Sequence, residues 1–168
     1  QGMTGLSFVL ARKSVLDAAA HNPVRSYYTN LVMQYEGFEK TGEMRFTPPV
    51  QVVYAAKRAL AEYFAEGETK KWARHTRVMA AIHEWLESLG LEEAIPREIQ
   101  SGLVAAVRYP DDPHFDFTRV HDYCYERGFT IYPGKMQTEK TFRLCALGAI
   151  DVPDIAAFFH VLEDAMKA

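Results

Sequence analysis

The sequence predicts an α+β fold in which a small antiparallel or mixed sheet carries helices on one face. One observation indicates this architecture, and a second indicates that part of a larger sheet lies outside this chain. After a long helical stretch, the patterns follow the order helix, strand, helix, strand, strand, helix, with short strands rich in β-forming residues. A near-continuous apolar run also stands alone at the start of the chain, as a strand does when most of its sheet lies elsewhere. The 168 residues suffice for one sizeable domain, or for one domain and part of another.

Composition excludes several classes of function. Charged residues make up 24% of the chain, hydrophobic residues 48%, and the net charge is −3, which gives no electrostatic reason to expect nucleic acid or an anionic membrane as partner. The six histidines show no HxH or HExxH spacing, so we expect no metal site. Cys124 and Cys145 fall in apolar surroundings, which favours reduced core thiols and a cytoplasmic protein. We find no apolar run of the roughly 18 residues that a membrane helix needs.

The first 47 residues are expected to begin with a buried strand, Leu6–Arg12. Ser14 then opens a short helix, and Asp17 completes a pattern close to a capping box. The sheet that would cover the strand is expected outside this chain. Residues 24–41 are interpreted as a short helix and a loop, with Gly37 breaking the helical pattern.

A pair of long helices follows. Thr47 is a good N-cap and Pro48 a good first helical residue, so the first helix is expected to begin there and to end at Gly67. The second helix is predicted over Glu68–Leu89, with Gly90 after it.

The last 78 residues alternate between strands and helices. A strand is predicted over Leu103–Tyr109, followed by a helix that begins near Asp116 and stops at Gly128. Two more strands, Phe129–Tyr132 and Thr141–Leu147, are joined through a Pro-Gly turn. A terminal helix then starts after Asp151.

Arg143 is the candidate functional residue that stands out by its position. It lies inside a predicted strand between Phe142 and Leu144, so its side chain points away from both. A guanidinium there must reach water or meet an anion, because burying it unpaired is costly. It is then either a solvated or ion-paired strand residue, or a fork that grips a substrate carboxylate.

Several stretches resemble one protein family. The run RGFTIYPGK, the run TFRLCALG and the amphipathic helix after them are similar to the C-terminal domain of the class V, fold type I aminotransferases, which depend on pyridoxal phosphate. The stretch RFTPPVQVVYAAKRALAEYF resembles the interdomain region of that family, and QGMTGLSFVLARKSVL resembles the strand and helix after its catalytic lysine. The resemblance implies an α/β parent fold. It divides this chain into a large-domain remnant (1–47), an interdomain helix pair (48–90) and an α+β small domain (91–168).

The resemblance also implies a reaction. The branch of the family most similar in the GFTIYPGK motif transfers the amino group of 2-aminoethylphosphonate to pyruvate, a step of phosphonate catabolism. An alternative is another class V activity, of the alanine–glyoxylate or serine–pyruvate type. A third is a non-catalytic α+β interaction module.

Site residues follow by the same resemblance. Arg143 matches the arginine that binds the substrate carboxylate. Thr47 matches a threonine that contacts the cofactor phosphate of the neighbouring subunit in a homodimer, with a plain helix N-cap as its alternative. Arg45 is a further candidate for that phosphate, with solvent exposure as its alternative. The Schiff-base lysine is expected just before Gln1, in the large domain, and no lysine of this chain is in a suitable setting, so the chain alone is expected to be inactive.

Overall fold

A computed structural model of the chain describes residues 2–168, and Gln1, next to which the catalytic lysine is expected, lies outside the described residues. The chain forms two compact units, Gly2–Glu62 and Tyr63–Ala168, whose boundary falls within helix α3 (Val50–Glu66). The division at residues 47 and 90, which the family resemblance implies, stays a prediction. No helix among the described residues has both the length and the apolar composition to cross a bilayer.

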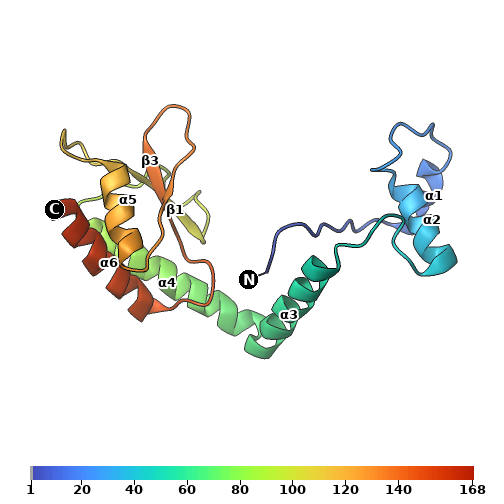
Figure 1. Cartoon of the computed structure of the whole chain (residues 1–168), viewed down its shortest axis with the longest axis horizontal. Coiled ribbons are helices and arrows are strands. Elements are labelled where there is room, and N and C mark those ends of the chain that lie inside the picture. The colour runs from blue at the N-terminus through green and yellow to red at the C-terminus, as the bar shows by residue number, and fades with distance from the viewer. Residues whose placement is uncertain (1) are drawn as a thin grey trace. The chain divides into compact units, whose positions relative to one another are not determined.

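The unit Tyr63–Ala168 is the α+β domain that the sequence predicts (Figure 1). Beyond the last turn of α3, its elements are α4 (Glu68–Ser88), β1 (Val104–Arg108), α5 (Phe117–Glu126), β2 (Tyr132–Pro133), β3 (Thr141–Cys145) and α6 (Val152–Lys167). Asp116 caps α5 by accepting hydrogen bonds from the backbone N–H groups of Thr118 and Arg119. Asp151 and Asp154 form a capping box at the start of α6.

The sheet is antiparallel, with strand order β1-β3-β2. Strand β3 is therefore the central strand, paired with β1 from Val104↔Cys145 to Arg108↔Thr141. Its pairing with β2 is much shorter, Tyr132↔Arg143 and Pro133↔Phe142. The predicted strand Phe129–Tyr132 is thus shifted toward its C-terminal end, and the predicted Thr141–Leu147 strand ends at Cys145. The predicted Pro133-Gly134 turn is wrong, because Pro133 belongs to β2 and the backbone N–H of Gly134 donates to the Thr141 carbonyl.

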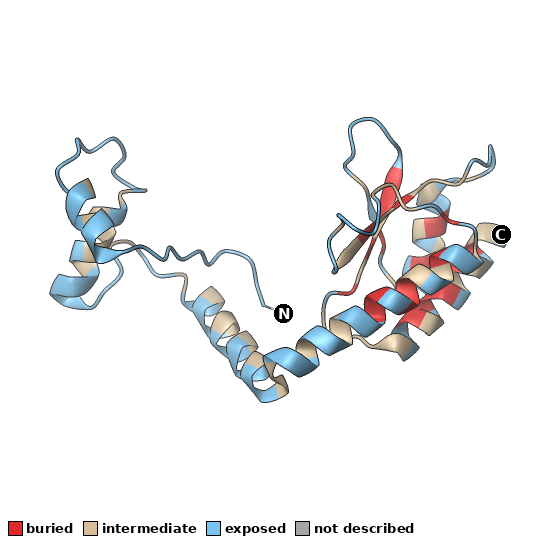
Figure 2. Ribbon diagram, turned by 180° about the vertical axis from the view of Figure 1, so that it is seen from behind, coloured by how far each residue is buried: buried red, intermediate tan, exposed pale blue. Residues whose placement is uncertain are grey.

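One face of the sheet is covered by helices and forms the core. Ala105 and Val107 on β1 are buried, as are Phe142 and Leu144 on β3, whereas the residues between them are only partly buried. This alternation is typical of a sheet with one face toward the core. The helices contribute their apolar stripes, and Trp85 of α4 stacks on Phe159 of α6 with ring centroids 5.5 Å apart. All buried residues of the described chain belong to this unit (Figure 2).

Two arginines tie α4 to the loop between β3 and α6. Arg74 donates to the backbone oxygens of Gly148 (2.9 Å) and Ile150 (3.1 Å), and also forms a two-point pair with Glu66. Arg77 makes a two-point pair with Asp151, the N-cap of α6. These contacts fix the loop that leaves the central strand.

The unit Gly2–Glu62 has a different character, because it contains no buried residue. Its helices are α1 (Lys13–Ala19), α2 (Leu31–Thr41) and the first part of α3. The predicted strand Leu6–Arg12 is wrong for this structure: the segment is not a strand, and Phe8 and Leu10 are 81% and 90% exposed. A strand needs a hydrogen-bonded neighbour, and the described residues offer none to this segment.

The helix ends of this unit also differ from prediction. Asn30 caps α2 and the helix runs through Gly37 to Thr41, so Gly37 does not break it. Helix α1 begins at Lys13 after Arg12, which makes no side-chain cap bond, and the expected Ser14 capping box is absent. Helix α3 begins at Val50, after Pro48 and Pro49, so Thr47 is not its N-cap. Two successive prolines place a turn before the first full helical residue.

Glu93 organises the segment that covers the outer edge of β1. Its carboxylate accepts hydrogen bonds from Arg97 (2.6 Å) and Gln100 and lies 3.0 Å from His83 Nδ1, while its side chain is only 8% exposed. Burial alone would raise the pKa of this carboxyl, but the hydrogen bonds from Gln100 and Arg97 and the charge of Arg97 hold it below its ordinary value.

We therefore expect Glu93→Gln to destabilise the chain by about 1–3 kcal/mol at pH 7. The folded-state pKa lies below the ordinary value of 4.5, so this stabilisation is present above about pH 4.5 and is lost as the pH falls through the folded pKa. Urea unfolding at several pH values measures it. Glu84→Gln, at an exposed position of the same helix as His83, is the control and should change stability by less than about 0.5 kcal/mol at every pH. A difference between wild type and Glu93→Gln that grows toward acid pH would contradict this account.

Candidate functional site

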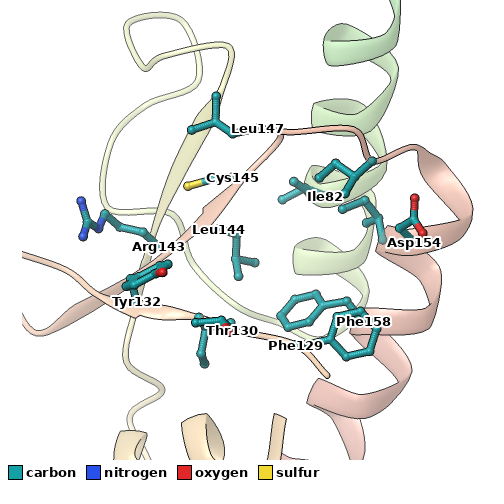
Figure 3. Close-up of a pocket in the computed structure, with 13 residues that line it drawn as sticks. Ile82, Phe129, Thr130, Tyr132, Arg143, Leu144, Cys145, Leu147, Asp154 and Phe158 are labelled. Carbon is teal, nitrogen blue, oxygen red and sulfur yellow. The ribbon is translucent and has the colours of Figure 1, made fainter. Parts of the chain in front are cut away.

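Arg143 occupies the middle of the central strand, on the face of the sheet that the helices leave uncovered. Its neighbours Phe142 and Leu144 point into the core. Because successive side chains of a strand point to opposite faces, the guanidinium lies on the other side of the sheet. Ala106 lies directly across from it on β1 and Tyr132 on β2. Figure 3 shows the Arg143 side chain directed away from Ile82 and Phe158, which belong to α4 and α6.

The charge of Arg143 has no partner among the described residues. The buried Nε atom makes no hydrogen bond, and no carboxylate of the described chain lies within ion-pair distance of the guanidinium. Arg108, on the neighbouring strand, shows the contrast: it pairs with Glu139 (2.8 Å) and donates to the backbone oxygen of Glu93 (2.9 Å). The structural ion pair considered for Arg143 is therefore not formed here, and an anion from outside the described residues would find paired donors.

A largely apolar cavity of about 370 Å³ lies between β3 and α6 (Figure 3). Arg143 borders this cavity, but the figure shows its guanidinium on the opposite side. Cys145 also borders it, and burial raises the pKa of this thiol. The thiol is therefore protonated and unreactive at neutral pH. The remaining lining residues include Ile82, Phe129, Leu144, Leu147, Ile155 and Phe158.

Arg45 is held by aromatic side chains in the unit Gly2–Glu62. Its guanidinium carbon lies 4.3 Å from the ring centre of Tyr27 and 5.2 Å from that of Phe46. The Nη1 atom is buried and makes no hydrogen bond to a described residue. Thr47 is exposed, two residues further along. Stacking of this kind fixes a guanidinium while leaving its N–H groups available for an anion.

The structure places these candidate residues in separate units. Arg143 belongs to Tyr63–Ala168, while Arg45 and Thr47 belong to Gly2–Glu62. The lysines are exposed except for Lys71, which is half-buried beside Glu66 at 3.9 Å. The absence of a Schiff-base lysine from this chain stays a prediction. No cluster of three or more histidine, cysteine, aspartate or glutamate side chains in residues 2–168 is arranged to hold a metal ion.

Sequence comparison identifies relatives along the entire chain. No protein-family model matches. The chain is 33% identical over 169 residues to a 2-aminoethylphosphonate–pyruvate transaminase of Burkholderia ambifaria and 38% identical over 153 residues to one of Pseudomonas fluorescens. These alignments cover 100% and 89% of this chain, but 45% and 41% of the relatives. The chain thus spans less than half the length of the curated relatives it matches.

Solved structures agree on the fold. A pyridoxamine–pyruvate aminotransferase from Mesorhizobium loti matches 93% of this chain and 41% of its own, with a TM-score of 0.78 at 24% identity. An alanine–glyoxylate aminotransferase from Nostoc sp. matches 92% of this chain and 42% of its own, with a TM-score of 0.77 at 19% identity. The fold is that of fold type I aminotransferases. Along its whole length the chain is related in sequence to aminotransferases, in agreement with the class V, pyridoxal-phosphate-dependent family that its sequence motifs predict. Within that family, the curated relatives just described are 2-aminoethylphosphonate–pyruvate transaminases.

Tyr132 is a residue near Arg143 that sequence reasoning missed. It lies directly opposite Arg143 in the β2–β3 pair, and it is 57% exposed. The two residues are separated by a connection too long to reveal the pairing register. Gly134 is the local signal that could have indicated it, because a glycine inside a strand often marks the close approach of another backbone.

Gly134 sets this register by close approach. Its backbone N–H donates to the backbone carbonyl oxygen of Thr141 at 2.6 Å. A Cβ atom at position 134 would lie 2.8 Å from this carbonyl oxygen and would collide with the Thr141 hydroxyl. Glycine is needed here because there is no space for a Cβ atom. Its backbone φ is not positive, so conformational freedom is not the reason.

Replacing Gly134 by alanine should therefore destabilise the domain by about 1–3 kcal/mol, because the added methyl group pushes β2 away from β3. Unfolding in urea, followed by tryptophan fluorescence, measures the change. Gly102→Ala is the matched control, since nothing lies within 4 Å of its Cβ position. Equal stabilities of the two variants would refute the close-packing explanation.

Proposed function

We propose that this chain is part of an aminotransferase that moves the amino group of 2-aminoethylphosphonate to pyruvate, giving phosphonoacetaldehyde and alanine. Identities of 33% and 38% to transaminases named for these two substrates support the assignment. The chain covers less than half of those relatives, so the activity is proposed for the larger protein. We further propose that this protein is a cytoplasmic homodimer.

The observation that carries the proposal is the unpaired guanidinium of Arg143. Its N–H groups lie on the uncovered face of the central strand, without a described acid to neutralise them. A carboxylate offers two oxygens that match the two parallel donors of an arginine. Arg143 would therefore bind the carboxylate of pyruvate and fix the orientation of its carbonyl carbon, which lowers the entropic cost of reaching the reactive geometry.

Arg45 and Thr47 fit the phosphate group of pyridoxal phosphate. The guanidinium of Arg45, which has no acid beside it among the described residues, and the hydroxyl of Thr47, an exposed residue, both offer hydrogen-bond donors for phosphate oxygens. We propose that they contact the cofactor of the neighbouring subunit in the homodimer. The bound cofactor supplies an electron sink for the amino transfer, and this chain contributes binding and orientation.

Arginine at position 143 should matter for its shape and not only for its charge. In the complete enzyme, we expect Arg143→Lys to raise the KM for pyruvate about 10- to 100-fold, because lysine offers a point charge in place of a fork. Steady-state kinetics at varied pyruvate concentration measure this. Arg119→Lys, on the exposed side of α5, should leave the KM within about twofold. An unchanged KM for Arg143→Lys would remove Arg143 from the substrate site.

Donor preference tests the proposed reaction as a whole. The complete enzyme should turn over 2-aminoethylphosphonate with pyruvate at least about tenfold more efficiently, in kcat/KM, than alanine or serine with glyoxylate or pyruvate. A coupled assay for the aldehyde and keto acid products decides it. Higher efficiency with alanine or serine would indicate another class V activity, and no turnover of any donor would favour a non-catalytic module.

A further inference from the structure

The side chain of Tyr132 stands next to Arg143 on the uncovered face of the sheet. Directly opposite residues of an antiparallel pair share a face, with Cβ atoms about 4.5–5.5 Å apart. Figure 3 shows the tyrosine ring beside the Arg143 side chain, and both residues border the cavity between β3 and α6. The phenol makes no hydrogen bond or ring contact with any residue of the described chain. Its hydroxyl is thus available to a ligand.

The local packing keeps Tyr132 at this place. A slip of one residue would turn its side chain to the core face. Such a slip is opposed by Gly134, whose backbone packs against Thr141, a residue only 3% exposed, and by Pro133, which lies opposite the buried Phe142. Three successive pairings therefore hold the phenol at the side of the guanidinium.

The other neighbours of Arg143 on the two adjoining strands offer less to a ligand. Ala106, its partner on β1, has no polar side-chain atom. Thr141, two residues before Arg143 on β3, carries a hydroxyl, but this residue is only 3% exposed and packs against Gly134, so it is not open to a ligand. Cys145, two residues along the strand, carries a protonated thiol, which is a weak hydrogen-bond donor. A phenol O–H is a good donor to a carboxylate and, being neutral, does not compete with it for the guanidinium.

We propose that Tyr132 is a second binding residue for the carboxylate that Arg143 holds. The phenol O–H donates a hydrogen bond to one carboxylate oxygen, while the guanidinium of Arg143 donates to the same group from the adjacent strand. Both side chains are long and rise from directly opposite positions, so one carboxylate can contact both. This inference rests on the proposed function, in which Arg143 binds pyruvate.

Four variants of the complete enzyme test it, with pyruvate as the varied substrate. Tyr132→Phe keeps the ring and removes only the hydroxyl, and should raise the KM for pyruvate about tenfold with little change in kcat, as expected for one hydrogen bond to a charged group. Tyr125→Phe is the matched control, because Tyr125 is 65% exposed on α5, and its KM should stay within about twofold. Arg143→Lys and the double variant complete a cycle.

If both residues bind one carboxylate, the KM of the double variant rises by less than the product of the two single effects. A Tyr132→Phe enzyme with unchanged KM, or two effects that multiply fully, would overturn the role of Tyr132 and leave the proposed function standing. If instead Arg143→Lys has no effect on the KM for pyruvate, the proposed function itself fails. Because Tyr132 is exposed and its hydroxyl makes no described contact, the phenylalanine variant should fold normally, which its thermal unfolding temperature verifies.

Discussion

The covered face of a three-stranded antiparallel sheet is the constraint on which the α+β unit depends. Strand β3 lies between β1 and β2, so it is paired along both edges, and α4, α5 and α6 cover one of its faces. Because side chains alternate along a strand, burial of Phe142 and Leu144 forces Arg143 to the uncovered face. The position of the candidate carboxylate-binding group thus follows from the packing of its two apolar neighbours.

Helix α4 connects this sheet to the rest of the chain. It contributes Val78, Ile82 and Leu86 to the core, and its first turns carry the arginines that hold the loop after β3. Arg74 joins that loop to Glu66 at the end of α3. These contacts are charge-assisted, and the Arg74 side chain is largely buried. They therefore hold the loop after β3 and the end of α3 more firmly than exposed ion pairs would.

The two compact units differ in how far they bury their apolar side chains. Tyr63–Ala168 has a continuous core, whereas Gly2–Glu62 exposes many large apolar side chains, among them Phe8, Leu10 and Tyr54. Apolar residues left in water contribute nothing to folding, so α1 and α2 depend on helix propensity, on limited packing against each other and, for α2, on the Asn30 cap. The apolar patterns read from this region are typical of buried elements, and they agree with a chain that spans less than half the length of its relatives.

The sequence by itself determined the α+β architecture, the long helices and their glycine ends, and the choice of Arg143. These features depend on local periodicity, on residues such as Gly67 and Asp151 that fix helix ends, and on motifs that are contiguous in the chain. Only the tertiary structure decided that Leu6–Arg12 is not a strand here, since strand formation requires a partner. It also decided that Arg143 has no acid beside it and that Tyr132 lies opposite it, because cross-strand register is a long-range property that no local pattern encodes.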